Sequence, residues 1–123
     1  MALTTSGRNH LVGLAVGEAL TTFNAANAHL GVGNGVTAFA AADTDLVGAS
    51  KTRKAMDATF PTRATNVLTF KATFATTEAN HAWDEVGVFN AATAGVMLSR
   101  VVTALGTKTS SSSFALTHTV TFS

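Results

Sequence analysis

Apolar and polar residues alternate with a period of two over much of the second half of the chain. In the segment 67–74, apolar side chains occupy the even positions and mostly polar ones the odd positions. The segment 114–122 repeats the pattern, with Thr or Ala at every odd position and His118 within the otherwise apolar even series. Strict alternation is typical of a strand that buries one face, so both segments are predicted to be β-strands.

Two further runs with strand character enclose a turn. Trp83–Phe89 and Val96–Thr103 are rich in β-branched and aromatic residues, and 90–95 between them ends in glycine. This arrangement predicts a β-hairpin. On the inward faces of these strands and of the two alternating ones, the residues predicted to be buried are Phe70, Phe74, Val86, Val88, Leu98, Leu116, Val120 and Phe122.

The first half of the chain contains shorter signals. Ala28–Val32 and Lys51–Asp57 read as strands, and 37–45 reads as a loop because it is small and polar. Asn34-Gly35 is predicted to form a turn, since both residue types accept a positive φ. Pro61 is expected in a turn or on a sheet edge, because proline has no N–H for a strand ladder.

A helical period occurs only near the start. In 6–23, apolar residues recur at spacings of three and four, which predicts an amphipathic helix capped by Thr5 or Ser6. Gly13 and Gly17 weaken this helix, and we expect them to permit tight packing on the sheet. The residues of the apolar stripe are Leu11, Leu14, Ala15, Leu20 and Phe23.

These elements predict a mainly β protein, an antiparallel β-sandwich of about six strands with one N-terminal helix. Consecutive strands with short connections favour antiparallel pairing. We expect a single domain over 1–123, with the helix at about 6–23 and the β-sandwich at about 28–123. The polar segment 106–113 is predicted to be a flexible loop before the last strand.

Charge is scarce in this sequence. Charged residues make up 12% of the 123 positions, about half of the ~25% usual in globular domains. The net charge of +1 lacks the basic excess that nucleic-acid binding requires. A surface with few charges is poorly protected against association, so we expect partner proteins to cover it. A small Thr-rich monomer remains the alternative.

Targeting signals and cysteine chemistry are not expected. Met1–Thr5 lacks the basic region and apolar run of a signal peptide, and no apolar run approaches membrane-spanning length. The sequence contains no cysteine, which removes disulfides and Cys-based metal sites. We therefore expect a protein that is soluble when made, with no membrane partner.

No histidine has the spacing of a metal site. His10, His29, His81 and His118 are far apart in the sequence, and His118 on an apolar strand face is expected to be a packed core residue. The adjacent carboxylates Asp84-Glu85 would point to opposite faces of a strand, so they are not expected to act as an acid–base pair.

The other candidate groups also favour structural roles. Asp43 and Asp45 lack the further ligands of a calcium loop and are expected to form turn or capping hydrogen bonds. Gly31–Gly35 lacks the Lys-Ser/Thr of a phosphate loop. Ser110–Ser113 reads as linker. A solvated strand face is preferred to a phosphate patch for the cluster Lys51, Arg53 and Lys54. We predict no catalytic, cofactor-binding or metal-ligating residues, no cofactor, and a protein that is not an enzyme.

The order of these segments resembles the tail-collar and tail-fibre attachment domains of tailed bacteriophages. The most specific segment is 85–90, Glu-Val-Gly-Val-Phe-Asn, which is similar to the family's E-V/A-G-L-F-D/N strand and turn. The remaining matches are the small-residue helix and the segments 28–35, 43–47, 51–55, 67–74 and 91–100.

The resemblance implies a virion structural protein, assembled in the host cytoplasm. It implies self-assembly as a homo-oligomer, with a trimer as the expected state, and docking on tail, baseplate or capsid proteins. Because the chain ends at Ser123, directly after a strand, we expect a fibre adaptor or a stand-alone collar or capsid decoration protein. A host-receptor or carbohydrate-binding module is the alternative, although Trp83 is the only tryptophan and tyrosine is absent.

Overall fold

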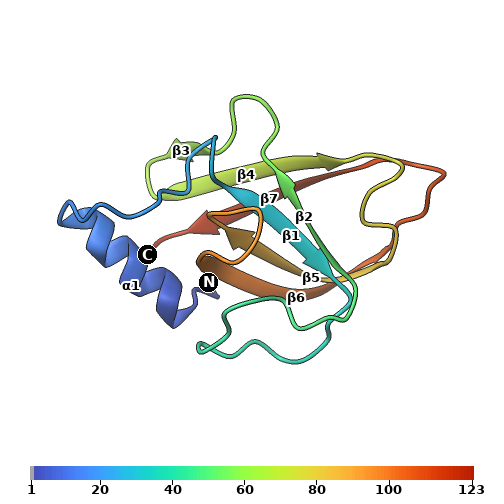
Figure 1. Cartoon of the computed structure of the whole chain (residues 1–123), viewed down its shortest axis with the longest axis horizontal. Helices are drawn as coiled ribbons and strands as arrows, with labels where there is room; N and C mark the ends of the chain where they lie inside the picture. The colour runs from blue at the N-terminus through green and yellow to red at the C-terminus, as the bar shows by residue number, and fades with distance from the viewer. Residues whose placement is uncertain (1) are drawn as a thin grey trace.

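The computed structural model describes residues 2–123 as seven strands in two antiparallel sheets, with one short helix at the N-terminal end (Figure 1). This confirms the predicted mainly β fold with one N-terminal helix. The elements are α1 (Thr5–Ala15), β1 (His29–Gly33), β2 (Lys51–Ala55), β3 (Thr62–Ala64), β4 (Val67–Phe74), β5 (Ala82–Phe89), β6 (Met97–Thr107) and β7 (Phe114–Thr121).

The two sheets face each other across the main core. One sheet has the order β2-β1-β5-β6 and the other has the order β3-β4-β7. The hairpin β5–β6 forms as predicted, with Phe89 opposite Met97. β4 and β7 pair along their whole length, from Val67 opposite Thr121 to Phe74 opposite Phe114. Chain segments far apart in sequence therefore form the second sheet.

Most of the residues predicted to be buried line this core. Phe70, Phe74, Val86, Val88, Leu98 and Val120 are at most 3% exposed. Leu116 and Phe122 are only half-buried, because β7 lies at the edge of its sheet and no described strand neighbours it on that side. An aromatic group fixes one end of the core, where Trp83 meets Phe74 and Phe114 edge to face, with ring centroids 4.9 and 5.2 Å apart.

A shift of register in β5 decides which of its side chains enter the core. The pairing with β6 is irregular between Trp83 and Glu85, so Trp83 and Val86, three residues apart, both pack in the main core. Glu85 and Phe89 point to the opposite face of the sheet. A bulge of this kind re-aims side chains at one position of a strand.

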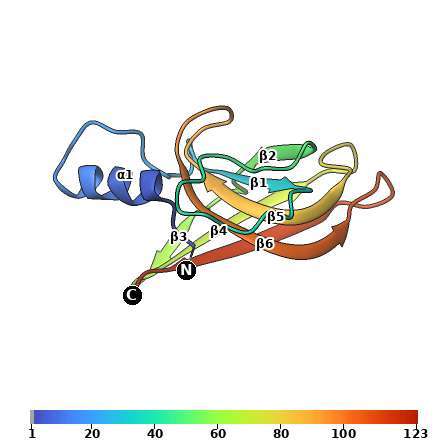
Figure 2. The ribbon, with the colours of Figure 1, turned by 90° about the horizontal axis from the view of Figure 1, so that it is seen from below.

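The helix is shorter than predicted, because it ends at Ala15 rather than at Phe23. Gly17 adopts a left-handed φ of 82°, which terminates the helix, and the chain then folds back so that Leu20 lies against Gly13. The cap is also one residue earlier than predicted. The side chain of Thr4, not Thr5 or Ser6, accepts the N–H of Gly7. Figures 1 and 2 show α1 beyond the end of the two sheets.

The connection between β1 and β2, residues 34–50, is not the tight turn predicted at Asn34-Gly35. Neither residue has a positive φ, and Asn34 instead accepts the N–H of Ser50 on its side chain at 3.1 Å. Pro61 precedes the edge strand β3. β3 was missed in the sequence because three residues are too few to show a period. β6 also continues four residues beyond the predicted end, to Thr107.

Candidate functional site

One side of the sandwich is closed and the other is open. On the closed side, the chain after β2 crosses to β4, where the N–H of Asp57 donates to the carbonyl of Lys71 at 2.8 Å. On the open side, β6 ends one sheet and β7 ends the other, and the two strands do not pair. We call the space between them the β6–β7 seam.

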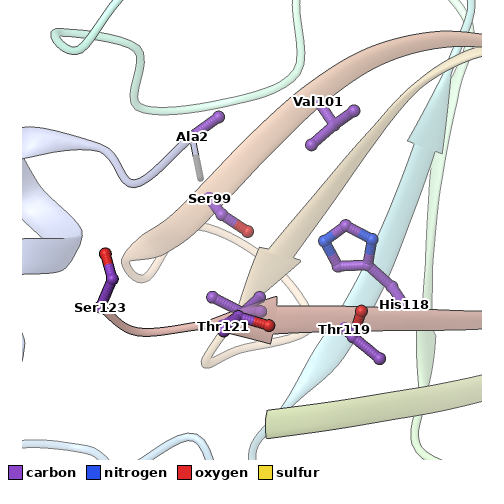
Figure 3. A pocket seen from close by; sticks show the side chains of 8 residues that line it. Ala2, Ser99, Val101, His118, Thr119, Thr121 and Ser123 are labelled. Carbon is purple, nitrogen blue, oxygen red and sulfur yellow. The ribbon is translucent and has the colours of Figure 1, made fainter. Parts of the chain in front are cut away.

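The seam contains a hollow at each end. The first, of about 360 Å³, lies between Ser99 and Val101 on one wall and His118 and Val120 on the other, and the C-terminal Ser123 borders it (Figure 3). The second, of about 330 Å³, lies where Leu105 faces the inner side chains of β7. Its lining residues are Trp83, Leu105, Ser113, Phe114, Ala115 and Leu116.

The inner row of β7 is incompletely covered along this seam. Phe114, Leu116 and His118 are only half-buried, although they point towards the core side of the strand. The outer row, formed by Ala115 and three threonines, is exposed. Side chains that a closed sandwich would bury thus remain accessible at the β6–β7 seam.

Ser99 and His118 lie on opposite walls of the first hollow. Ser99 is 2% exposed, and its Oγ has no hydrogen-bond partner among the described residues. His118 stands on the opposite wall (Figure 3). Burial lowers the pKa of His118 below its usual value, so its neutral form is favoured at pH 7. His118 was predicted to be a packed core residue, and the structure places it at the margin of the core.

The start of the chain covers one end of the β6 edge. Leu3 forms an antiparallel bridge with Ser99. The N–H of Thr4 donates to the carbonyl of Leu98 at 3.0 Å, and the N–H of Arg100 donates to the carbonyl of Ala2 at 3.1 Å. The edge of β6 therefore already accepts extended backbone over this stretch, and no strand among residues 2–123 pairs with this edge beyond Arg100.

The outer face of the larger sheet carries a buried ion pair that the sequence analysis did not identify. The Nε of Arg100 donates to Oε1 of Glu85 at 2.8 Å, and both side chains are fully buried. The guanidinium also donates to a carboxylate oxygen of Asp43 at 3.0 Å and to the carbonyl of Thr37 at 2.8 Å. Arg100 therefore anchors the connection 34–50 to the sheet.

Glu85 completes this anchor through backbone N–H groups. Its carboxylate accepts the N–H groups of Gly35 at 3.0 Å, Val47 at 3.0 Å and Gly48 at 2.7 Å. Burial by itself raises the pKa of Glu85, but the bonds from Arg100 and the three N–H groups outweigh it and hold the pKa below its usual value. Gly35, the last residue of the segment Gly31–Gly35, thus helps to form an anion-binding site, and the carboxylate of Glu85 occupies this site.

The glycines beside this carboxylate are needed for close approach. A Cβ on Gly35 would meet Glu85 and Val47, and a Cβ on Gly48 would meet the backbone nitrogens of Gly35 and Asn34 at 2.6 and 2.7 Å. The connection therefore lies directly on the sheet, where Leu46 packs with Phe89 and Met97 in a second, smaller core.

The charged residues of 43–54 form specific pairs. Asp43 and Asp45 accept the backbone N–H groups of Ala40 and Leu46, which confirms their predicted turn role. Asp45 also pairs with Lys51 at 2.9 Å and with Arg53 at 3.4 Å. The predicted solvated face is wrong for Arg53, because its guanidinium lies 3.5 Å from the centroid of the Phe89 ring and is shielded from water.

The remaining candidates from the sequence are not brought together. His10 contacts the carbonyl of Thr21 at 2.6 Å, His29 contacts the carbonyl of Asn27 at 2.8 Å, and His81 contacts Thr52 Oγ1 at 3.1 Å. Glu85 is fully buried in the ion pair with Arg100, whereas the adjacent Asp84 is only half-buried. Ser110–Ser113 lies in the connection between β6 and β7. Lys54, the third member of the basic cluster, pairs with Glu78 at 2.7 Å.

Within residues 2–123, no group of three or more His, Cys, Asp or Glu residues could hold a metal ion. The same residues include no helix that is long and apolar enough to cross a membrane. No protein-family model, curated protein or solved structure matches the chain.

Proposed function

We propose that this chain is a structural protein of a tailed bacteriophage virion, a fibre or collar attachment subunit or a capsid decoration subunit. It acts by symmetric self-assembly as a homo-oligomer and by docking on tail, baseplate or capsid proteins. It is assembled in the host cytoplasm and performs no catalysis.

The observation that carries this proposal is the open β6–β7 seam. It combines two strand edges with a half-buried apolar row, and its walls bear almost no charge. Exposed strand edges without charges favour pairing with another chain. A surface of this kind suits a protein that is permanently covered by partners.

The resemblance to phage attachment domains gives the proposal its biological setting. Each residue of the most specific segment, 85–90, has a structural role in this fold. Glu85 binds the connection 34–50, Gly87 lies under Leu46, and Phe89 lies under Arg53. Asn90 accepts the N–H of Val96 and shapes the hairpin turn. The segment 85–90 thus anchors the connection 34–50 and shapes a hairpin turn, and these structural roles suit an assembly subunit.

The alternative of a carbohydrate-binding module receives less support. Sugar binding commonly uses exposed aromatic rings, but the single tryptophan, Trp83, is 2% exposed and belongs to the core. Trp83 also donates its indole N–H to the carbonyl of Ala79 at 3.0 Å, so this N–H is not free to bind a sugar hydroxyl.

The proposal is tested with the purified full chain and with capsids and tails of the phage that encodes it. Mass photometry and co-sedimentation should show a homo-oligomer that binds one of the two particle fractions. An unrelated small β-sandwich protein of similar mass is the control for adventitious sticking. A monodisperse monomer that binds neither fraction would refute the proposal.

A further inference from the structure

The four strands at the sheet edges differ in how they are protected against pairing with another chain. Proteins protect edges with charges, bulges, short strands or covering segments. β2 carries Lys51, Arg53 and Lys54. β3 has only three residues, of which one is Arg63. Both of these edges are therefore protected.

β6 is protected at both ends by different means. The segment from Ala2 to Thr4 lies along its first residues. Near its other end, Gly106 adopts a left-handed φ of 97°, and the pairing with β5 is irregular between Trp83 and Glu85. A twisted, irregular edge is a poor template for a regular ladder.

β7 shows none of these features. Its eight residues contain no Asp, Glu, Lys, Arg, Pro or Gly, and its register with β4 is regular from end to end. No described segment pairs with its outer edge. Among the strands that the structure describes, β7 is thus the edge best suited to accept another strand.

The direction of the free hydrogen-bonding groups on β7 follows from its pairing with β4. The N–H of Phe122 donates to the carbonyl of Asn66 on the β4 side at 2.9 Å. Backbone groups of successive residues in a strand point to alternate sides. Ala115, Thr117, Thr119 and Thr121 therefore direct their N–H and C=O groups towards the unpaired edge.

We propose that the outer edge of β7 pairs antiparallel with β7 of a second copy of this chain, across a two-fold axis at Thr117. The two three-stranded sheets then form one continuous six-stranded sheet. This inference rests on the self-assembly part of the proposed function and specifies its contact. A two-fold contact is self-complementary and produces a dimer, which differs from the trimer that the resemblance implies.

The chemistry of the edge identifies a second copy as the occupant. Over 101–123 the only Lys, Arg, Asp or Glu is Lys108, which is buried and bonded to Asn80 at 2.7 Å. A polyanion or an anionic membrane would find no complementary charge there, whereas a second copy meets no like charge. In the outer row, Thr117 would meet Thr117 of the second copy, which is a favourable pair across strands, and Thr119 would meet Ala115.

The half-buried inner row points to the same occupant. With Thr117 at the axis, Leu116 of one copy lies opposite His118 of the other, and Phe114 lies opposite Val120. The apolar residues that the β6–β7 seam leaves half-covered would then be covered by the same residues of the second copy. This register also keeps the two histidines from facing each other directly.

Cross-linking tests the register. Because the chain has no cysteine, Thr117→Cys introduces a single thiol in the otherwise intact protein. Residues opposite each other in a hydrogen-bonded antiparallel pair have Cα atoms ~5.5 Å apart, which lies within disulfide range. Mild oxidation should convert most of the Thr117→Cys protein to a covalent dimer. Thr62→Cys, at an exposed threonine on β3, measures the background from random collisions.

Added charge tests the contact independently. Thr117→Lys places two ammonium groups opposite each other at the axis, and should raise the dimer dissociation constant about tenfold or more. Thr62→Lys is the matched control and should leave it unchanged. Thermal melts establish that both variants fold, and Thr119→Lys replaces Thr117→Lys if the latter does not.

Cross-linking at Thr117 above the control, together with weakened dimerisation of Thr117→Lys, supports the inference. A trimer, or a dimer in which Thr117→Cys cross-links no better than Thr62→Cys, overturns the β7 pairing and leaves self-assembly standing. A chain that stays monomeric and still docks on tails or capsids also overturns the β7 pairing, but leaves the docking role. A monomer that binds neither overturns both proposals.

Discussion

Arg100 donates its Nε–H to Glu85 over 2.8 Å, and both side chains are completely buried on the outer face of the larger sheet. The two residues come from neighbouring strands, β5 and β6, and the remaining hydrogen bonds of their side chains all reach the connection 34–50. This pair therefore holds the connection 34–50 against the outer face of the larger sheet.

Removal of the positive member of this pair should be strongly destabilising. Arg100→Met leaves the Glu85 carboxylate buried without its cation, and such a change typically costs about 3–5 kcal/mol of unfolding free energy. Urea denaturation measures it. Arg63→Met on the exposed strand β3 should stay within about 0.5 kcal/mol of the parent.

The double variant Glu85→Gln, Arg100→Met measures the energetic coupling between Glu85 and Arg100. Because the effects of substitutions within one hydrogen-bonded network are not additive, the double variant should lower the free energy of unfolding by clearly less than the sum of the two single variants. Additive costs would indicate that Glu85 and Arg100 stabilise the fold independently, contrary to the contacts described here.

Acid should weaken the same anchor. The folded pKa of Glu85 is lowered relative to its unfolded value near 4.3–4.5, so its contribution is fully present above that pH and is lost as the pH falls through the folded pKa. We expect the melting temperature to fall below about pH 4.5. Glu85→Gln should flatten part of this decline, and Asp45 and Glu78, whose pKa values are also lowered, contribute to what remains. A decline identical in the parent and in Glu85→Gln would contradict this role.

His118 should produce a separate pH effect at milder acidity. Burial lowers its folded pKa below the unfolded value of about 6.5, so the unfolded chain takes up the proton first. Stability should therefore begin to fall below about pH 6.5 and continue to fall until the folded His118 is protonated. His118→Phe should remove this slope in urea titrations between pH 7.5 and 5.5. An unchanged slope would show that another group is responsible.

Phe74 tests the packing between the two sheets. It is fully buried and meets Trp83 edge to face, so Phe74→Ala should cost about 3–5 kcal/mol and lower the melting temperature by many degrees. Val12→Ala on the 67%-exposed helix position is the control and should have little effect. A melting temperature unaffected by Phe74→Ala would mean that the inner face of β4 is assigned wrongly.

The sequence by itself determined the strands whose residues alternate between a buried and an exposed face. The bounds of β4 were predicted to the residue, and those of β7 to within one, because a period of two can be recognised in a strand without knowledge of its neighbours. The bounds of β5 were also predicted to within one residue, from its β-branched and aromatic residues. β3 is too short to show that period. The helix ended early because Gly17 could leave the helical region of φ while Leu20 and Phe23 packed back against the protein.

Only the tertiary structure decided which side chains meet across long stretches of chain. In the sequence, Glu85 was only one of two adjacent carboxylates expected on opposite faces of a strand. In the structure, Arg100, Gly35, Val47 and Gly48 converge on it from three separate segments. Asn34-Gly35 looked like a turn, yet its glycine is needed for contact with that carboxylate. The strand order likewise leaves β7 at an edge. Nothing in its own alternating pattern distinguishes an edge strand from a central one, because the difference lies in whether a neighbour satisfies its second row of backbone hydrogen bonds.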